Sequence, residues 1–213
     1  QEGQPIAALP GATWDDTLES AVIASDGTVG LSGDLVDGVP TTEDDLLVYG
    51  TTLLAQEGVT VPTGQLGTEF WENFDIDDFW ISANGSVWLA QGDLTGATAT
   101  DGIVASSGAV VVQEGVILPG SGFPDPVDVA GIVGVQLDPA GNWFARGNND
   151  VSEQDWIVRN GVVLATLGDP VRCARLRMLA DRHRHQPDDA DLSRARSEVH
   201  ARICGEQDIR GAA

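Results

Sequence analysis

The chain has 213 residues, enough for one or two domains with a sizeable hydrophobic core. Its formal net charge is −22 and it contains no lysine, so its surface repels polyphosphate and argues against a nucleic-acid partner. The sequence also lacks an apolar run of the roughly 18 residues that a helical membrane span needs.

Charge is divided unevenly along the chain. Residues 1–171 hold 26 Asp and Glu and 2 Arg, whereas residues 172–213 hold 7 acidic residues and 9 Arg. All three His, both Cys and the only Met also follow Val171. We therefore predict two parts, a β-repeat domain at 1–171 and an arginine-rich tail at 172–213.

A short motif repeats through the first part. It reads Gln-Glu-Gly at 1–3, 56–58 and 113–115, with a degenerate copy at Thr166-Leu167-Gly168. Successive glycines of the motif are 55, 57 and 53 residues apart. A fixed period of this length is typical of stacked structural repeats. Because the chain begins inside one copy, we expect it to be a piece of a longer repeat array.

Each repeat predicts two β-hairpins. After the motif come a short apolar segment, a Pro-Gly or Pro-Thr-Gly break, and an aromatic residue in a polar loop (Trp14, Phe70-Trp71 and Phe123). The first hairpin turns at Asp26-Gly27, Asn84-Gly85 and Pro139-Ala140-Gly141; such dipeptides suit tight turns that need positive φ. A glycine is predicted to close each returning strand, at Gly33, Gly92 and Gly147.

The second hairpin completes a unit of four antiparallel strands. It pairs 45–48 with 53–55, 102–105 with 109–112, and 156–158 with 162–164. Units of this size bury little by themselves and need neighbours, as propeller blades do. We therefore predict an all-β fold of three consecutive four-stranded repeats, a partial β-propeller-like array.

The repeat pattern stops at Arg172. Apolar residues then recur at helical spacing, which predicts two short helices at about 172–184 and 190–204 in a helical or disordered tail. Three explanations compete for this segment: a genuine tail, a reading-frame shift in a GC-rich gene that leaves it non-native, and a linker to another domain.

The runs 45–64 and 74–94 resemble tandem repeats of secreted bacterial propeller-like proteins. The resemblance lies in the hairpins at Val22–Leu31 and Ile81–Leu89 and in Gly168-Asp169-Pro170, which is similar to the start of that repeat. It covers residues 1–171 only. It implies a propeller-like fold and an extracellular or cell-surface setting in a bacterium, and it implies no activity.

Calcium is the one cofactor for which the repeats offer ligands. Asp75, Asp77 and Asp78 supply carboxylate oxygens in a closely spaced run, and Ca²⁺ takes six to eight oxygen ligands. Phe79-Trp80 follow where a calcium loop would continue with glycine, so a solvated acidic loop is the alternative. Asp44-Asp45 and 148–150 are weaker candidates of the same kind.

Other site chemistry is sparse. Trp71, predicted to lie in a loop, is the candidate for stacking on a sugar ring, whereas tryptophans at strand positions are expected in the core. Residues 1–171 contain no His or Cys, so no Ser-His or Cys-His pair forms within the repeats. In the tail, a zinc site, a disulfide or free side chains are the alternatives for Cys173, Cys204, His183, His185 and His200.

We predict a secreted or cell-surface repeat scaffold that binds a protein or a glycan and has no catalytic residues. The competing prediction is a carbohydrate-active hydrolase or lyase that uses acidic residues on a propeller face. A carboxylate pair serves glycoside hydrolysis, but among 26 acidic residues some pair always falls at a suitable distance.

Overall fold

The protein is described by a computed structural model that covers residues 2–36, 39–96 and 99–169, without the side chains of 16, 17, 76 and 77. Residues 1–167 form one compact unit. Every regular element in the described ranges is a β-strand, and none of these residues forms a helix able to cross a membrane. The all-β prediction is therefore confirmed, while the predicted tail helices lie outside the described residues.

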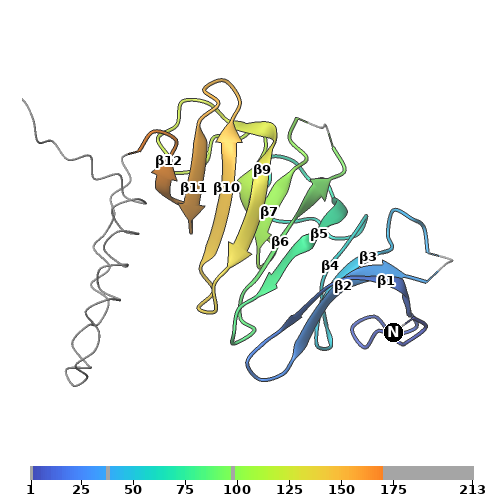
Figure 1. The fold of residues 1–213 in the computed structure, drawn as a ribbon. Helices are drawn as coiled ribbons and strands as arrows, with labels where there is room; N and C mark the ends of the chain where they lie inside the picture. Colours follow the sequence, from blue (N-terminus) through green and yellow to red (C-terminus); the bar gives the residue numbers. More distant parts are fainter. Residues whose placement is uncertain (1, 37–38, 97–98, 170–213) are drawn as a thin grey trace, which may run out of the picture. The chain divides into compact units, whose positions relative to one another are not determined.

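In the described part of the chain, twelve strands form three four-stranded antiparallel sheets, each built from consecutive strands (Figure 1). The first sheet contains β1 (Trp14–Ile23), β2 (Val29–Leu35), β3 (Asp45–Tyr49) and β4 (Thr52–Gln56). The second contains β5 (Trp71–Ile81), β6 (Trp88–Leu94), β7 (Ile103–Ser106) and β8 (Ala109–Gln113). The third contains β9 (Val127–Leu137), β10 (Trp143–Asn149), β11 (Asp155–Arg159) and β12 (Val162–Thr166).

The predicted tight turns of the first hairpins are confirmed. Gly27, Gly85 and Gly141 have φ of 86°, 71° and 85°, a region that costs glycine little. The side chain before each glycine, or close to it, closes the turn by accepting a backbone N–H. The acceptors are Asp26 for Thr28, Asn84 for Ser86 and Asp138 for Ala140, at 2.8, 3.1 and 2.9 Å.

The glycines predicted to end the second strands lie inside them instead. Gly33, Gly92 and Gly147 are each followed by two more residues of β2, β6 and β10. The first strand of each sheet is bulged, and in the second and third sheets the bulge brings that strand's backbone close to the glycine. A Cβ at Gly92 would overlap the carbonyl oxygen of Asn73, and one at Gly147 would overlap that of Gly131. These glycines therefore permit the bulges.

The repeated motif joins one sheet to the next. Its glycine donates its backbone N–H to the carbonyl of the residue that begins the next sheet. The three bonds are Gly3 to Trp14 at 2.8 Å, Gly58 to Trp71 at 2.8 Å, and Gly115 to Val127 at 2.9 Å. This recurrence explains why the motif has the period of the fold.

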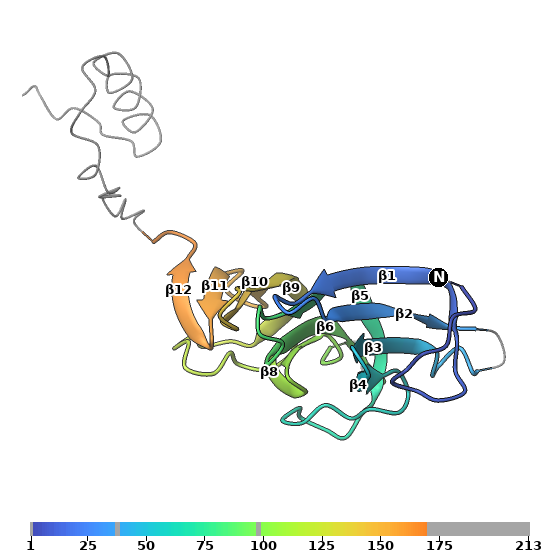
Figure 2. The same cartoon turned by 90° about the horizontal axis from the view of Figure 1, so that it is seen from below.

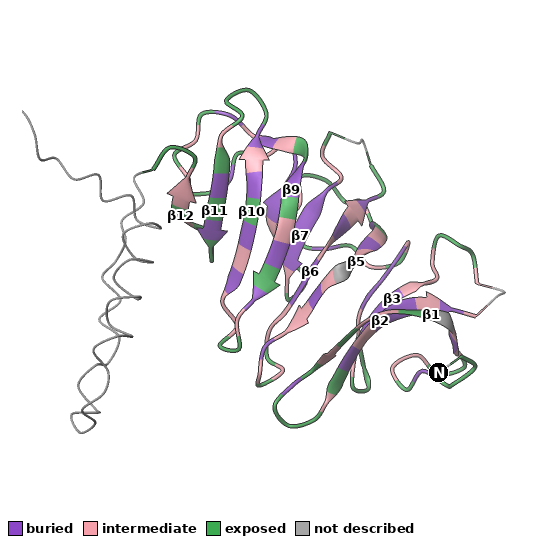
Figure 3. Cartoon of the chain, in the orientation of Figure 1, coloured by how far each residue is buried: buried purple, intermediate pink, exposed green. Residues whose placement is uncertain are grey.

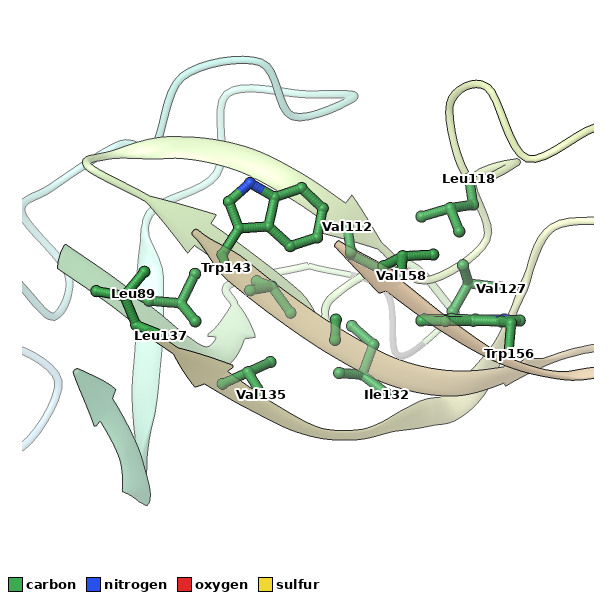
Figure 4. Close-up of a cluster of buried hydrophobic side chains, with 12 residues drawn as sticks. Leu89, Val112, Leu118, Val127, Ile132, Val135, Leu137, Trp143, Trp156 and Val158 are labelled. Atoms are coloured by element: carbon green, nitrogen blue, oxygen red, sulfur yellow. The ribbon is translucent and has the colours of Figure 1, made fainter. Parts of the chain in front are cut away.

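Adjacent sheets bury apolar side chains between them. One core lies between the first and second sheets around Leu47 and Phe79. Another lies between the second and third sheets around Val112 and Trp156 (Figure 4). The tips of the first hairpins are also linked, because Ser25 N–H donates to the Ala83 carbonyl at 2.7 Å and Ala83 N–H donates to that of Pro139 at 3.0 Å. Figure 2 shows the sheets following one another in chain order.

Candidate functional site

Three carboxyl groups meet on one face of the first sheet, each from a different strand. They belong to Glu19 in β1, Asp34 in β2 and Asp45 in β3, and all three residues are half-buried. Asp34 and Asp45 lie directly opposite each other in the strand register. Glu19 reaches them from a bulge between Leu18 and Ser20. One oxygen of each carboxyl group lies within 4.8 Å of the others.

Like charges and burial oppose ionisation of this cluster. Burial, the hydrogen bond to Asp34 and the charges of Asp34, Glu19 and Glu57 raise the pKa of Asp45 to about 8. Burial and the charge of Asp34 also raise the pKa of Glu19. Within the described ranges the only arginines are Arg146 and Arg159, both in the third sheet, so no cationic side chain of the first sheet balances the cluster.

The glutamate of the repeated motif supports the cluster from its flank. Glu57 is buried, and one of its carboxylate oxygens accepts the backbone N–H of Asp45 at 3.4 Å. Burial, together with a hydrogen bond and repulsion from Asp44, raises the pKa of Glu57 to about 7, although the N–H of Asp45 acts in the opposite direction. Glu57 is therefore coupled to the cluster, because it accepts the hydrogen bond that holds the backbone of Asp45 in place.

The position of Asp34 has a different partner in the other two sheets. Asp93 accepts a hydrogen bond from the side-chain amide N–H of Asn73 at 3.0 Å, and the backbone N–H of Asp93 donates to the side-chain Oδ1 of Asn73 at 3.2 Å. In the third sheet Asn148 donates its amide to Asp128 at 3.2 Å. In the second and third sheets a carboxylate is therefore paired with an amide. In the first sheet the cluster instead brings Asp34 together with two other carboxyl groups.

Such a cluster has two ways to relieve its repulsion. It can retain protons near neutral pH, as the raised pKa of Asp45 indicates. It can instead hold a cation that prefers oxygen ligands, with water completing the coordination. The three carboxylates of Glu19, Asp34 and Asp45 are therefore a candidate metal site.

The run predicted to bind calcium lies inside a strand, so its placement in a loop was wrong. Residues 75–78 form the bulged part of β5, opposite Gln91, between the pairs Phe74–Gly92 and Phe79–Ala90. Burial and the charge of Asp93 raise the pKa of Asp75, while a hydrogen bond with Gln91 lowers it. Asp78 has an interaction partner, and the side chain of Asp77 lies outside the described residues. A calcium site at Asp75, Asp77 and Asp78 stays a prediction.

Trp71 was predicted to lie in a loop, which is wrong. It is the first residue of β5 and is 0% exposed, with its ring centroid 4.9 Å from that of Phe74. It therefore offers no surface to a sugar ring. Trp143 and Trp156 are buried, and Trp80 and Trp88 pack against the cores, as expected for strand positions.

The sequence pointed to only one member of the cluster. Asp44-Asp45 was a weaker calcium candidate, but Glu19 and Asp34 were not considered. The available signal was the repeat itself, because aligning the glycines at 33, 92 and 147 shows Asp, Asp and Asn at the next position. The candidate zinc or disulfide residues, Cys173, Cys204, His183, His185 and His200, lie outside the described residues.

Comparison with known proteins adds no assignment: no protein-family model, curated protein or solved structure matches the chain. The geometry of the sheets and of the carboxyl cluster therefore carries the functional argument.

Proposed function

We propose that residues 1–167 act as a propeller-like binding scaffold, secreted or held at the cell surface of a bacterium, whose first sheet binds Ca²⁺. The metal ligands are Glu19, Asp34 and Asp45. The observation that supports this proposal is the gathering of three carboxylate oxygens within 4.8 Å without a cationic side chain in that sheet.

Calcium suits this site better than magnesium. Ca²⁺ accepts irregular coordination and mixed ligands, whereas Mg²⁺ demands a near-ideal octahedron and keeps several waters. Three half-buried carboxylates on separate strands offer a loose set of hard oxygen ligands. A site with this few protein ligands belongs with the weak calcium sites of extracellular modules, with Kd on the order of 10⁻⁴–10⁻³ M. Such an affinity favours a setting outside the cell.

Calcium would stabilise the first sheet of the proposed scaffold. The three ligands lie on β1, β2 and β3, so one ion would fix these strands against each other. Glu57 adds the link between Asp45 and the motif that leads into the second sheet. We propose that the partner is a protein or a glycan and that binding needs no chemical step.

A carbohydrate-active hydrolase or lyase is the second candidate function. Values of about 8 for the pKa of Asp45 and about 7 for that of Glu57 suit a general acid near neutral pH. Glycoside hydrolysis also needs a second carboxylate on the other side of the bond. Release of reducing sugar from a polysaccharide panel, lost in the Asp45→Asn variant, would favour this function over the scaffold.

Calcium-dependent thermal unfolding tests the metal site. At a Ca²⁺ concentration about ten times Kd, mass action gives about 1.4 kcal/mol of stabilisation and raises Tm by roughly 3–6 °C for a domain of this size. We expect this rise for the full chain, and we expect Asp34→Asn to abolish it. Calorimetric titration with CaCl₂ gives Kd independently.

Asp93→Asn is the matched control, because Asp93 occupies the same position in the second sheet and is paired with Asn73. It should leave the calcium-induced rise in Tm unchanged. An equal loss in both variants, or an equal rise with NaCl of the same ionic strength, would mean that cations only screen the acidic surface. The calcium site would then be wrong, while binding of a macromolecular partner would remain to be tested separately.

A further inference from the structure

The third sheet leaves open the face that the first two sheets bury against their neighbours. Leu47, Val104 and Ile157 occupy the same register position, opposite Ala55, Val112 and Ala165 of the last strand. Leu47 and Val104 are each 0% exposed, but Ile157 is 45% exposed. Figure 3 shows exposed stretches along β9 and β11, at this end of the described chain.

The difference follows from what covers each position. Leu47 belongs to the core shared with the second sheet, and Val104 belongs to the core shared with the third. Ile157 instead borders an open hollow of about 390 Å³, together with Val133, Arg146 and Leu167. Val133 and Leu164 on the same sheet are each 55% exposed. This face has the composition of a sheet–sheet interface, but no further sheet among the described residues covers it.

The first sheet has the complementary opening on its opposite face. The pairs Ile23–Val29, Ile81–Trp88 and Leu137–Trp143 are equivalent, because each flanks the turn of the first hairpin. In the second and third sheets these pairs pack into the core shared with the preceding sheet. In the first sheet Ile23 is 72% exposed and Val29 is 39% exposed. Ile6 covers the other end of this face, near Leu46 and Val48.

Charge favours a copy of the same acidic unit on the open face of the third sheet. Arg146 and Arg159 are the only basic residues among residues 1–171. Both alternate with the buried residues of their strands and lie beside the open apolar positions, with Arg146 opposite Ile157 and Arg159 opposite Phe144. The positions equivalent to Arg146 hold the neutral residues Ser32 and Gln91. Residues 1–171 hold 26 acidic residues, so two arginines on one face favour an acidic surface as partner, and a second copy of the chain supplies one.

We infer that the open face of β9–β12 docks the open face of β1 and β2 in a second copy of this chain. The contact is head to tail and repeats the packing found between the sheets within one chain. Two copies that make both contacts would assemble six sheets, within the four to eight of closed propellers. A rotation that does not close would give a filament instead.

Complementing variants of the full chain test this contact. Ile157→Arg places a charge on the open face of the third sheet only, and Ile23→Arg places one on the open face of the first sheet only. By sedimentation velocity and light scattering, the wild-type chain should associate, and each variant alone should show a Kd at least about tenfold higher, a loss of about 1.4 kcal/mol. A mixture of the two variants should associate again, because each supplies the intact face that the other lacks.

Val151→Arg is the matched control, since Val151 is 80% exposed in the connection between β10 and β11 and is not among the residues that line the hollow beside Ile157. It should associate like the wild type, and unchanged circular dichroism should confirm that all variants fold. A wild-type chain that stays monomeric at high concentration would overturn the inference. So would protection of an Ile157→Cys thiol from alkylation in that monomer, because the chain would then cover its own face. Association of Ile23→Arg alone would show that the third sheets pair with each other, which also contradicts the head-to-tail contact.

Discussion

Single carboxyl groups decide how the first sheet responds to pH and to cations. Asp45 lies between Asp34, Glu19 and Glu57, so its ionised form is disfavoured by burial and by three like charges. The same arrangement that favours a proton would favour a divalent cation, which removes the repulsion more completely. Proton and calcium are therefore expected to compete for Asp45.

This competition predicts an unusual pH dependence of stability. In chelator, the folded protein binds protons at Asp45 and Glu57 with pKa values of about 8 and about 7, against ordinary values of 3.8 and 4.5. A raised pKa stabilises the fold fully below the unfolded value, and this contribution is lost as pH rises through the folded value. The free energy of unfolding in urea should therefore fall between pH 5 and pH 9, and Asp45→Asn should flatten the fall.

Calcium should reverse this trend and release protons as it binds. The lowered pKa values of Asp26, Asp125 and Asp138 do not interfere, because their contributions to stability are lost only on acidification below the ordinary value of 3.8. A free energy of unfolding that rises steadily from pH 5 to pH 9 in chelator would contradict the proton-holding cluster.

At the scale of the elements, the motif glycines fix where one sheet ends and the next begins. Gly3 and Gly58 share a left-handed φ, 69° and 62°, and make the same hydrogen bond. They differ in surroundings, since a Cβ at Gly58 would overlap the carbonyl oxygen of Thr42, whereas a Cβ at Gly3 meets nothing within 4 Å. Of these two glycines, only Gly58 is therefore required by packing as well as by conformation.

Alanine at the two positions should separate these effects. Gly3→Ala is expected to cost about 1–2 kcal/mol of unfolding free energy, the price of left-handed φ alone. Gly58→Ala is expected to cost about 3–4 kcal/mol, because the Thr42 backbone must also move. Urea unfolding of both variants measures the difference. Equal losses would show that the backbone near Thr42 gives way without cost.

Sequence reasoning succeeded where the determinants were local. The turns at Asp26-Gly27 and Asn84-Gly85 need only their own residues, so the hairpins and the period could be predicted. The bulges could not, because they depend on how two strands pair, and this is why Trp71 and Gly92 were misplaced.

The carboxyl cluster could not be predicted from the sequence for the same reason. Asp34 and Asp45 are separated in the sequence, and no motif links them. They become neighbours only through the register of β2 and β3. Glu19 reaches them through a bulge in β1. Neither the register nor the bulge has a sequence signal as strong as a turn glycine.

At the scale of the whole molecule, stability comes from packing one sheet against the next. Each unit buries its apolar residues mainly in the cores between sheets, as expected of repeats that depend on nearest neighbours. A position inside such an interface should therefore matter more than the same position on an open face. Leu47 and Ile157 are that pair.

Their alanine variants give a test that depends on protein concentration. Leu47→Ala should lower the free energy of unfolding by about 2–5 kcal/mol at every concentration, because it leaves a cavity in a closed core. Ile157→Ala should cost under about 1 kcal/mol in dilute protein, where half of the side chain already contacts water. If copies dock head to tail, the cost of Ile157→Ala should grow as concentration rises, since association stabilises only the wild-type face. A small cost that stays constant at all concentrations would leave the open face of the third sheet without a role in assembly.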